Sequence, residues 1–419
     1  MSATGVSGGD RHTSIDAVRG MAVLGILLMN IVGMGMPTFA YVNPSYWGGF
    51  HGADLAVWAV NNVLTDGKMR ALFTMLFGAS TVLIADRATG QRPGPIATHY
   101  GRMFWLLLFG MAHAYLLWWG DILVAYAIAG LVIFPFRKLN PMLLIGIGLV
   151  ILAGLIAKDL IDAGQMEVLR AAATAPGASA AAIKAWQDAS VAVQAPADLA
   201  AAEIAGFRGT FMSALHARAY VAMLMQLVID PTDAIPEAIG QMLIGMALFR
   251  LGFFTLRWSS RAYAGVVAFG YLVAAPLTAW LAWMIWQSGF EPLVLHRLEV
   301  WQAASRPFIA LAHASVLLLI IRSGALTVLV NRLTAAGRMA FSNYLITSII
   351  TTLVFCGFGL GLYGQLSRFQ QLAVVAAVWV FILAWSRPWL ERFHYGPFEW
   401  LWRTLVRWKP QPFRKAVAA

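Results

Sequence analysis

Residues 102–130 read "RMFWLLLFGMAHAYLLWWGDILVAYAIAG", two apolar and aromatic runs separated by Gly120 and Asp121. Runs of this length and composition are typical of membrane-spanning helices. His113 lies inside the first run, and Asp121 lies at the junction between the two. Ionisable side chains are costly inside a bilayer and usually mark a functional site there. This stretch therefore predicts both the class of fold and the place to look for chemistry.

The composition of the whole chain supports the same class. Hydrophobic residues make up 60% of the 419 residues and charged residues only 12%, with a mean hydropathy of +0.71. A soluble domain carries roughly 25% charged residues. Segments of alternating hydrophobicity, which a membrane β-barrel requires, are missing from the sequence. We predict an all-α polytopic membrane protein, folded as a single transmembrane domain over residues 1–419.

Apolar runs of spanning length recur along the chain and predict about ten transmembrane helices. Between the first two runs, residues 51–68 are too short and too polar to span, so we expect an interfacial helix there. Residues 159–234 are expected to form a helical insertion outside the membrane, with 207–229 as an amphipathic helix on its surface. The predicted spans are 17–36, 69–86, 103–119, 121–136, 141–158, 235–252, 263–286, 306–322, 339–360 and 371–387.

The distribution of basic residues predicts the orientation. Most of the 30 Lys and Arg residues fall in alternate short loops and in the C-terminal tail, which the positive-inside rule places in the cytoplasm. We therefore expect a multi-pass protein of the cytoplasmic (inner) membrane with both termini inside. The net charge of +11 is interpreted as a topology signal and as contact with lipid headgroups, and not as a nucleic-acid surface. The single Cys356 excludes an intramolecular disulfide.

This orientation separates two sets of polar residues. One set is predicted near the outer leaflet, with His113 in the outer half of its span and Asp121 at a tight outer turn. The arginines gather on the inner side. Such a layout suits a reaction that takes one reactant from each side of the membrane. The other residues predicted on the outer side are Asn30, His51, Asp66 and Lys68.

Several motifs resemble the YeiB family of membrane proteins, which is often described only by a domain of unknown function. The resemblance runs from about residue 11 to residue 407, and residues 165–215 match poorly. The motifs are "SIDAVRGMAVLGILLMNI" (14–31), "KMRALFTMLFGAS" (68–80), the opening stretch (102–130), "GRMAFSNYLITSII" (337–350), "GLGLYG" (359–364) and "GPFEWLWR" (396–403).

The YeiB family is in turn similar to a wider set of transmembrane acyltransferases that includes the heparan-glucosaminide acetyltransferases. The shared element is the first span, here Asp16, Arg19, Gly20 and Asn30. The resemblance implies transfer of an acyl group, for instance acetyl, from cytosolic acyl-CoA to a hydroxyl or amine acceptor outside. "WGGFHGADL" (47–55) also resembles a segment of the glucosaminide enzymes. Their histidine precedes the tryptophan, whereas His51 follows it, so their catalytic role is not carried onto His51.

Acyl transfer needs a base near neutral pH and a donor to the developing oxyanion. We expect His113 to be the base and Asp121 to orient its imidazole, with His51 as the alternative base. Asn30 would donate to the thioester oxygen or position the acceptor. Asp66 and Lys68 are expected to bind the acceptor. On the inner side, we expect Arg19, Arg102 and Arg338 to bind the phosphates of coenzyme A. No zinc-site spacing, nucleophile elbow or phosphate-binding loop occurs, and no metal is expected.

Structural roles remain open for the same residues. Asp121 could simply cap the helix that begins after it, Asp16 and Arg19 could form an ion pair on one helix face, and Asn30 could join two helices. A transporter or flippase of a small solute or lipid is the second hypothesis, because polar groups on both sides could mark a substrate pathway. A non-catalytic membrane partner is the third. The expected partners are the lipid bilayer, acyl-CoA and an extracytoplasmic acceptor. The sequence is also compatible with a homo-oligomer.

Overall fold

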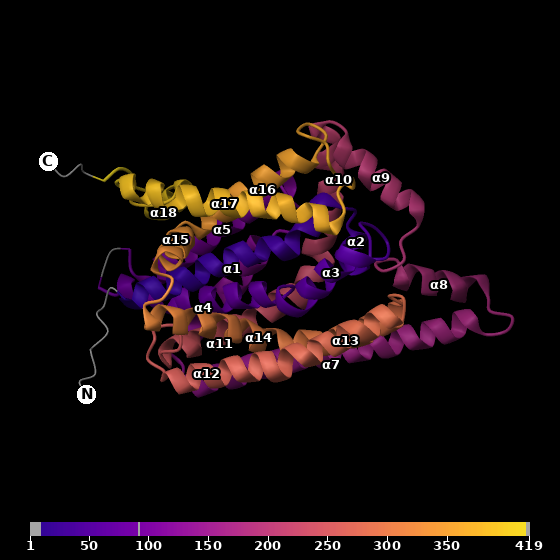
Figure 1. Ribbon diagram of the computed structural model, residues 1–419, viewed down its shortest axis with the longest axis horizontal. Helices are drawn as coiled ribbons and strands as arrows, with labels where there is room; N and C mark the ends of the chain where they lie inside the picture. The colour runs from indigo at the N-terminus through magenta and orange to yellow at the C-terminus, as the bar shows by residue number, and fades with distance from the viewer. Residues whose placement is uncertain (1–9, 91–92, 416–419) are drawn as a thin grey trace.

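The computed structural model describes residues 10–90 and 93–415, so both ends of the predicted domain lie outside the described residues. In this part of the chain, helices form all regular structure apart from one antiparallel bridge between Phe393 and Arg414. The predicted all-α class is confirmed (Figure 1). The helices are α1 (Asp10–Gly35), α2 (Phe39–Val42), α3 (Gly52–Leu64), α4 (Lys68–Ala88), α5 (Pro95–Leu116), α6 (Leu123–Ile133), η1 (Phe134–Lys138), α7 (Pro141–Thr174), α8 (Ala180–Ser190), α9 (Ala197–Arg208), α10 (Phe211–Leu224), η2 (Met225–Ala234), α11 (Ile235–Arg250), α12 (Ser260–Phe269), η3 (Gly270–Ala274), α13 (Ala275–Gln287), α14 (Pro292–Ser323), α15 (Thr327–Arg338), α16 (Ala340–Phe355), α17 (Arg368–Arg392) and α18 (Pro397–Arg407).

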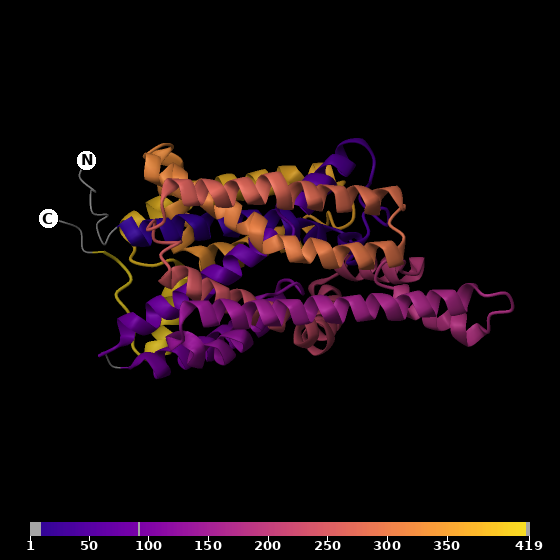
Figure 2. The ribbon, with the colours of Figure 1, turned by 90° about the horizontal axis from the view of Figure 1, so that it is seen from below.

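The long helices run side by side along one axis of the molecule (Figures 1 and 2). The start of α1 lies at the same end as α18, which we call the α18 end. The opposite end carries α2 and is called the α2 end. At the α2 end, α7 continues beyond the other helices, and α8 folds back from its tip (Figure 2). This projection belongs to the first half of the insertion predicted over 159–234.

Seven helices are long and apolar enough to cross a membrane, and the bent pair α15–α16, with 84° between its halves, makes eight. The chain is therefore a membrane protein with several spanning helices, although the predicted count of about ten is not confirmed. The predicted spans at 103–119 and 121–136 have no counterpart among these seven or eight. At 1.5 Å per residue, the 11 residues of α6 cover about 16 Å, about half the hydrocarbon core.

Two expected surface helices instead continue into spanning helices. Residues 51–68 were expected at the interface, but α3 runs on into α4, and Gly52–Ala88 forms one candidate span. Residues 207–229 were expected on the membrane surface, but α10 continues through the π-helical segment η2 into α11, and Phe211–Arg250 forms one candidate span. The first segment is interrupted only by the turn at residues 65–67, whereas the second stays helical throughout.

Helix α1 is central, because 78% of its most apolar window is buried inside the protein, against 11% for α7. Glycines let α15 approach α1 closely: a Cβ at Gly20 would lie 2.0 Å from the carbonyl oxygen of Leu333, and one at Gly337 would lie 1.7 Å from that of Asp16. Small residues allow such contacts between membrane helices. The motif glycines of 14–31 and 337–350 therefore position the two helices that flank the site described next.

Candidate active site

The turn between α5 and α6 brings the polar residues of the opening stretch together. Helix α5 ends at Leu116, and the backbone N–H groups of residues 117 and 118 both donate to the carbonyl of His113. The buried Arg218 of α10 donates to the Leu116 carbonyl at 2.9 Å and so satisfies the end of the helix. The Trp118 indole donates to the Gly33 carbonyl at 3.1 Å and anchors the turn on α1.

This compact turn places Asp121 against His113. Asp121 Oδ1 lies 2.7 Å from His113 Nδ1, and Asp121 Oδ2 accepts from the Val124 N–H at 2.8 Å. The carboxylate therefore both contacts the imidazole and caps α6. The two roles considered for Asp121, orienting His113 and capping the next helix, are compatible with each other. The His113 and Asp121 side chains are only 0% and 2% exposed. The tight turn predicted here is therefore present, but α10 covers it and the protein encloses it.

A third polar side chain, Ser348 of α16, completes the arrangement. Its Oγ lies 2.8 Å from His113 Nε2. A carboxylate at Nδ1 keeps the ring proton on that nitrogen, which leaves Nε2 free to accept the serine hydroxyl. Ser348 is fully buried. Hydroxyl, imidazole and carboxylate are thus joined in the order that activates a nucleophile in hydrolases and acyltransferases.

Helix α16 is fixed at both ends. At its start, Glu399 of α18 accepts from the backbone N–H groups of Phe341 at 2.8 Å and Ser342 at 3.0 Å. Burial raises the pKa of the Glu399 carboxyl, although these hydrogen bonds partly oppose the shift. Near its end, the Thr352 hydroxyl donates to the Leu117 carbonyl at 3.0 Å and ties α16 to the α5–α6 turn. Ser348 is therefore held in register with His113.

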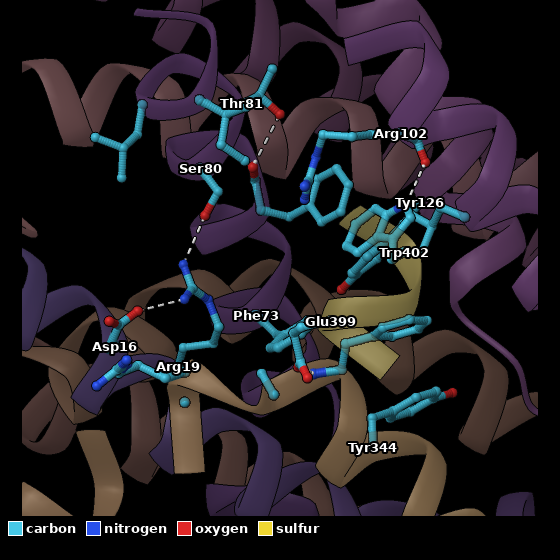
Figure 3. A pocket seen from close by; sticks show the side chains of 18 of the residues that line it. Asp16, Arg19, Phe73, Ser80, Thr81, Arg102, Tyr126, Tyr344, Glu399 and Trp402 are labelled. Atoms are coloured by element: carbon cyan, nitrogen blue, oxygen red, sulfur yellow. Dashed lines mark hydrogen bonds and ion pairs between the residues drawn. The ribbon is translucent and has the colours of Figure 1, made fainter. Parts of the chain in front are cut away.

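A cavity of about 390 Å³, part of whose lining is drawn in Figure 3, lies between residues of α18 and the residues next to this buried group. Its lining follows α5 from His99 to Leu106 and α16 from Ala340 to Tyr344. Five arginines lie on its wall toward the α18 end, whereas Ile122, next to Asp121, lies at the deep end. These arginines are Arg19, Arg87, Arg102, Arg338 and Arg403.

The three arginines predicted to bind coenzyme A therefore share one cavity, but their partners differ. Arg19 donates to Asp16 at 2.6 Å and to Ser80 at 2.8 Å, so it forms the ion pair considered as its structural alternative. The Arg102 guanidinium stacks over the Trp402 ring at 3.9 Å from its centroid (Figure 3). Arg338 is exposed. Among residues 10–90 and 93–415, neither Arg102 nor Arg338 forms an ion pair, so both guanidinium groups are available to an anion.

Tyr344 joins the cavity to the buried group. Its ring lines the deep end of the cavity and lies 4.9 Å, centroid to centroid, from the imidazole of His113. The residue is 7% exposed, and its hydroxyl faces the backbone of Ile122 but makes no well-formed hydrogen bond in the described part of the chain. A buried donor without a partner is unusual in a native structure. This hydroxyl therefore stands ready for a ligand that extends beyond the cavity.

Asp66 and Lys68, predicted to bind the acceptor, lie at the α2 end. Asp66 accepts from the Tyr41 hydroxyl at 2.8 Å and lines a small pocket of about 50 Å³, together with Glu299. Lys68 is buried at 1% exposure and donates to the backbone carbonyl of Asn62, so it does not line that pocket. Lys68 and Asp66 are thus close enough to interact electrostatically, but only Asp66 lines the pocket, and neither bonds to His113.

Asn30 and His51 lie apart from the buried group as well. Asn30 is half-buried, lines neither cavity, and makes no side-chain hydrogen bond with any described residue. His51 is exposed at the start of α3, and its ring lies tilted against Phe50 with 4.0 Å between ring centroids. Of the two predicted bases, only His113 has an orienting carboxylate.

Ser348 and Tyr344 were missed in the sequence, although both lie in the motif 337–350. A serine and a tyrosine in an apolar helix are ordinary residues, and four-residue spacing indicates only a shared helix face. Their importance depends on the packing of α16 against α5, which lies more than 200 residues earlier in the chain. The motifs themselves were recognised in the sequence, but their arrangement in space, which gives these two residues their importance, was not.

The comparisons with known proteins agree on one family. Residues 248–409 match the family model "Protein of unknown function (DUF418)". The chain is 32% identical over 413 residues to "Uncharacterized protein YeiB" of Escherichia coli (strain K12), covering 95% of this chain and 96% of that protein. It is 27% identical over 419 residues to "Uncharacterized protein YxaH" of Bacillus subtilis (strain 168), with 96% of each covered. No solved structure matches significantly. The identity and the coverage together show that the chain belongs to the YeiB family.

Proposed function

We propose that this protein is a membrane acyltransferase that takes an acyl group from acyl-CoA at the α18 end and passes it to a hydroxyl or amine acceptor from the α2 end. The observation that supports this proposal is the single cavity that has arginines at one end and Tyr344, in contact with His113, at the other. In the proposed orientation, the α18 end faces the cytoplasm, where acyl-CoA is found.

From the α18 end inward, the residues on the cavity wall match the successive parts of acyl-CoA. Arg102 and Arg338 offer guanidinium groups to phosphates, which arginine matches with paired N–H donors. Further in, Phe73, Phe77 and Leu106 present apolar surface to the pantetheine arm and the acyl chain. The volume of about 390 Å³ lies within the range of roughly 300–1,000 Å³ for small-molecule sites. His113 would act as the base beyond the deep end.

Binding of coenzyme A tests the donor side of the proposal. Arg102→Gln removes a guanidinium from the cavity wall while keeping a side chain that can lie on Trp402. We expect weaker binding of coenzyme A by calorimetry, on the order of tenfold for a lost interaction worth about 1.4 kcal/mol. The matched control is Arg297→Gln, because Arg297 is exposed on α14 and does not line the cavity. Equal affinity of the two variants would remove Arg102 from the site.

A transporter or flippase is the second candidate, because buried polar groups continue past the cavity. Tyr126 lines the cavity and bonds to the hydroxyl of Thr74, and Arg70, one turn before Thr74, donates to Glu237 at 2.9 Å. A polar path of this kind could serve solute movement. Reconstituted protein distinguishes the two functions: transport delivers an unmodified solute, whereas acyl transfer consumes acyl-CoA and releases a free thiol.

A further inference from the structure

We infer that Ser348 is the nucleophile of a two-step reaction, in which the acyl group is first transferred from acyl-CoA to the serine and then to the acceptor. This inference rests on the proposed acyltransferase function and goes beyond it, because a histidine base alone is equally compatible with direct transfer. The distinguishing feature is the hydroxyl that lies 2.8 Å from His113 Nε2.

The hydrogen bonds around Ser348 favour activation of its hydroxyl. The competing acceptor, the Tyr344 carbonyl one turn earlier in α16, lies 3.4 Å away, so the shorter contact with His113 is preferred. On the other side of the ring, Asp121 Oδ1 at 2.7 Å stabilises the imidazolium that forms when the hydroxyl gives up its proton. All three groups are shielded from water, which protects an acyl ester from hydrolysis.

Access to Ser348 depends on Tyr344. The cavity ends at this ring, one helical turn before Ser348. The Tyr344 hydroxyl makes no well-formed hydrogen bond with the described residues and meets only the backbone of Ile122, so little holds the ring against moving aside for a thioester. The hydroxyl can then donate to the oxyanion that develops on the thioester carbonyl, which is the role of an oxyanion-hole donor. Its weak bonding to the described residues and its place at the deep end both fit this role.

The chemistry balances in each half. Ser348 Oγ attacks the thioester carbonyl carbon while His113 Nε2 takes the hydroxyl proton. The proton passes to the sulfur as the carbon–sulfur bond breaks, which yields O-acyl-serine and the free thiol of coenzyme A. The acceptor hydroxyl or amine then attacks the ester carbonyl, His113 takes its proton, and the proton returns to Ser348 Oγ. No oxidant, reductant or metal takes part in these steps.

Because the first half needs no acceptor, it can be tested without knowing the acceptor. Purified protein is mixed with acetyl-CoA labelled in the acetyl group, quenched in acid, and digested for mass spectrometry. We expect a burst of free coenzyme A equal to the amount of protein, with the label on the peptide that carries Ser348. Ser348→Ala should lose burst and label together. Ser348→Cys should regain the label as a thioester that neutral hydroxylamine removes.

A matched control comes from Ser315 of α14, which is also fully buried and has no hydrogen-bond partner for its hydroxyl within the described residues. Ser315→Ala should label like the native protein. Tyr344→Phe should keep the label on Ser348 but slow its formation on the order of 10²–10³-fold, the usual cost of a lost oxyanion donor. This slowing should appear in the rate at saturating acetyl-CoA.

The outcomes separate the two proposals. Release of coenzyme A by a well-folded Ser348→Ala protein, or label on another residue, would overturn Ser348 as the nucleophile and leave the acyltransferase standing. A native protein that neither binds coenzyme A nor releases it from acetyl-CoA would overturn the acyltransferase itself, and the nucleophile with it.

Discussion

At the scale of single residues, the partners of the buried His113 side chain indicate its role. An imidazole with both nitrogens bonded and no exposed surface could serve packing alone. Here, however, its partners are a carboxylate and a hydroxyl, and the ring of Tyr344 links it to a cavity. Polar groups in a membrane protein are retained at a cost in stability, which favours a chemical role.

The relation between His113 and Asp121 can be measured as a coupling. Asp121→Asn keeps the cap on α6 but offers the imidazole a weaker, uncharged partner, so we expect a smaller loss of acyl transfer than for His113→Ala. The double variant should lose little more than His113→Ala alone, because residues that act as one unit are not additive. Acyl transfer per folded molecule is the measurement. Additive losses would show that the two residues act independently.

At the scale of elements, the α5–α6 hairpin is the least expected feature. Its sequence contains enough apolar residues for two spans, yet α6 is 11 residues long and the turn is buried. The reason lies outside the hairpin: Arg218 of α10 donates to the Leu116 carbonyl, and the Gly33 carbonyl of α1 accepts from the Trp118 indole, and these hydrogen bonds hold the turn inside the protein. Non-helical backbone is tolerated at membrane depth where the protein covers it. Hydropathy reports only the local sequence and could not have shown these partners.

Helix α9 gives a prediction about pH. Glu203 accepts from the Thr38 N–H at 2.9 Å and from the Tyr363 hydroxyl at 2.7 Å, which joins α9 to the loops at the α2 end. It lies outside the candidate spans. Burial raises the pKa of its carboxyl above the ordinary 4.5, although the hydrogen bonds to Thr38 and Tyr363 lower it in part.

A raised carboxyl pKa stabilises the folded state fully below the unfolded pKa of 4.5, and this contribution is lost as the pH rises through the folded pKa. Glu203→Gln has no such ionisation. We therefore expect the melting temperature of Glu203→Gln, relative to the native protein, to improve as the pH rises from 4.5 toward neutrality. Asp198→Asn is the control, because Asp198 is exposed on the same helix. A difference that stays constant with pH would contradict this account.

At the scale of the whole molecule, the two ends have different chemistry. The α18 end carries the arginines of the cavity wall, and the α2 end carries Asp66 and the projecting α7 and α8. A reaction across the membrane requires these ends to face opposite compartments.

Labelling of introduced cysteines tests this arrangement. Gly94 precedes α5 at the α18 end, and Ala197 begins α9, which lies at the α2 end. In a Cys356→Ser background, we expect a membrane-impermeant thiol reagent to reach a cysteine at 197 from outside the cell. A cysteine at 94 should react only after the membrane is permeabilised. Labelling of both from the same side would contradict the proposed topology.

The sequence was most informative where a property is local. Apolar run length predicted eight of the helices that qualify as spans, counting the bent pair, and the motifs predicted the family. The pairing of His113 with Asp121 was also expected, since it depends on a helix that ends between them. Ser348 and Tyr344 could not be predicted, because their role depends on which helix packs against α5. The predicted roles of Asn30 and His51 rested on depth in the membrane and on family resemblance, and neither specifies which side chains are their neighbours.

The central claim is that His113 performs acyl transfer, and the most direct measurement is thiol release from acetyl-CoA per folded molecule. His113→Ala is compared with the native protein and with His216→Ala, which removes an exposed histidine of α10. We predict that His113→Ala lowers the rate on the order of 10²–10⁴-fold, as expected for a lost general base, while coenzyme A binding persists and His216→Ala stays near the native rate. Near-native thiol release by a well-folded His113→Ala protein would contradict the claim.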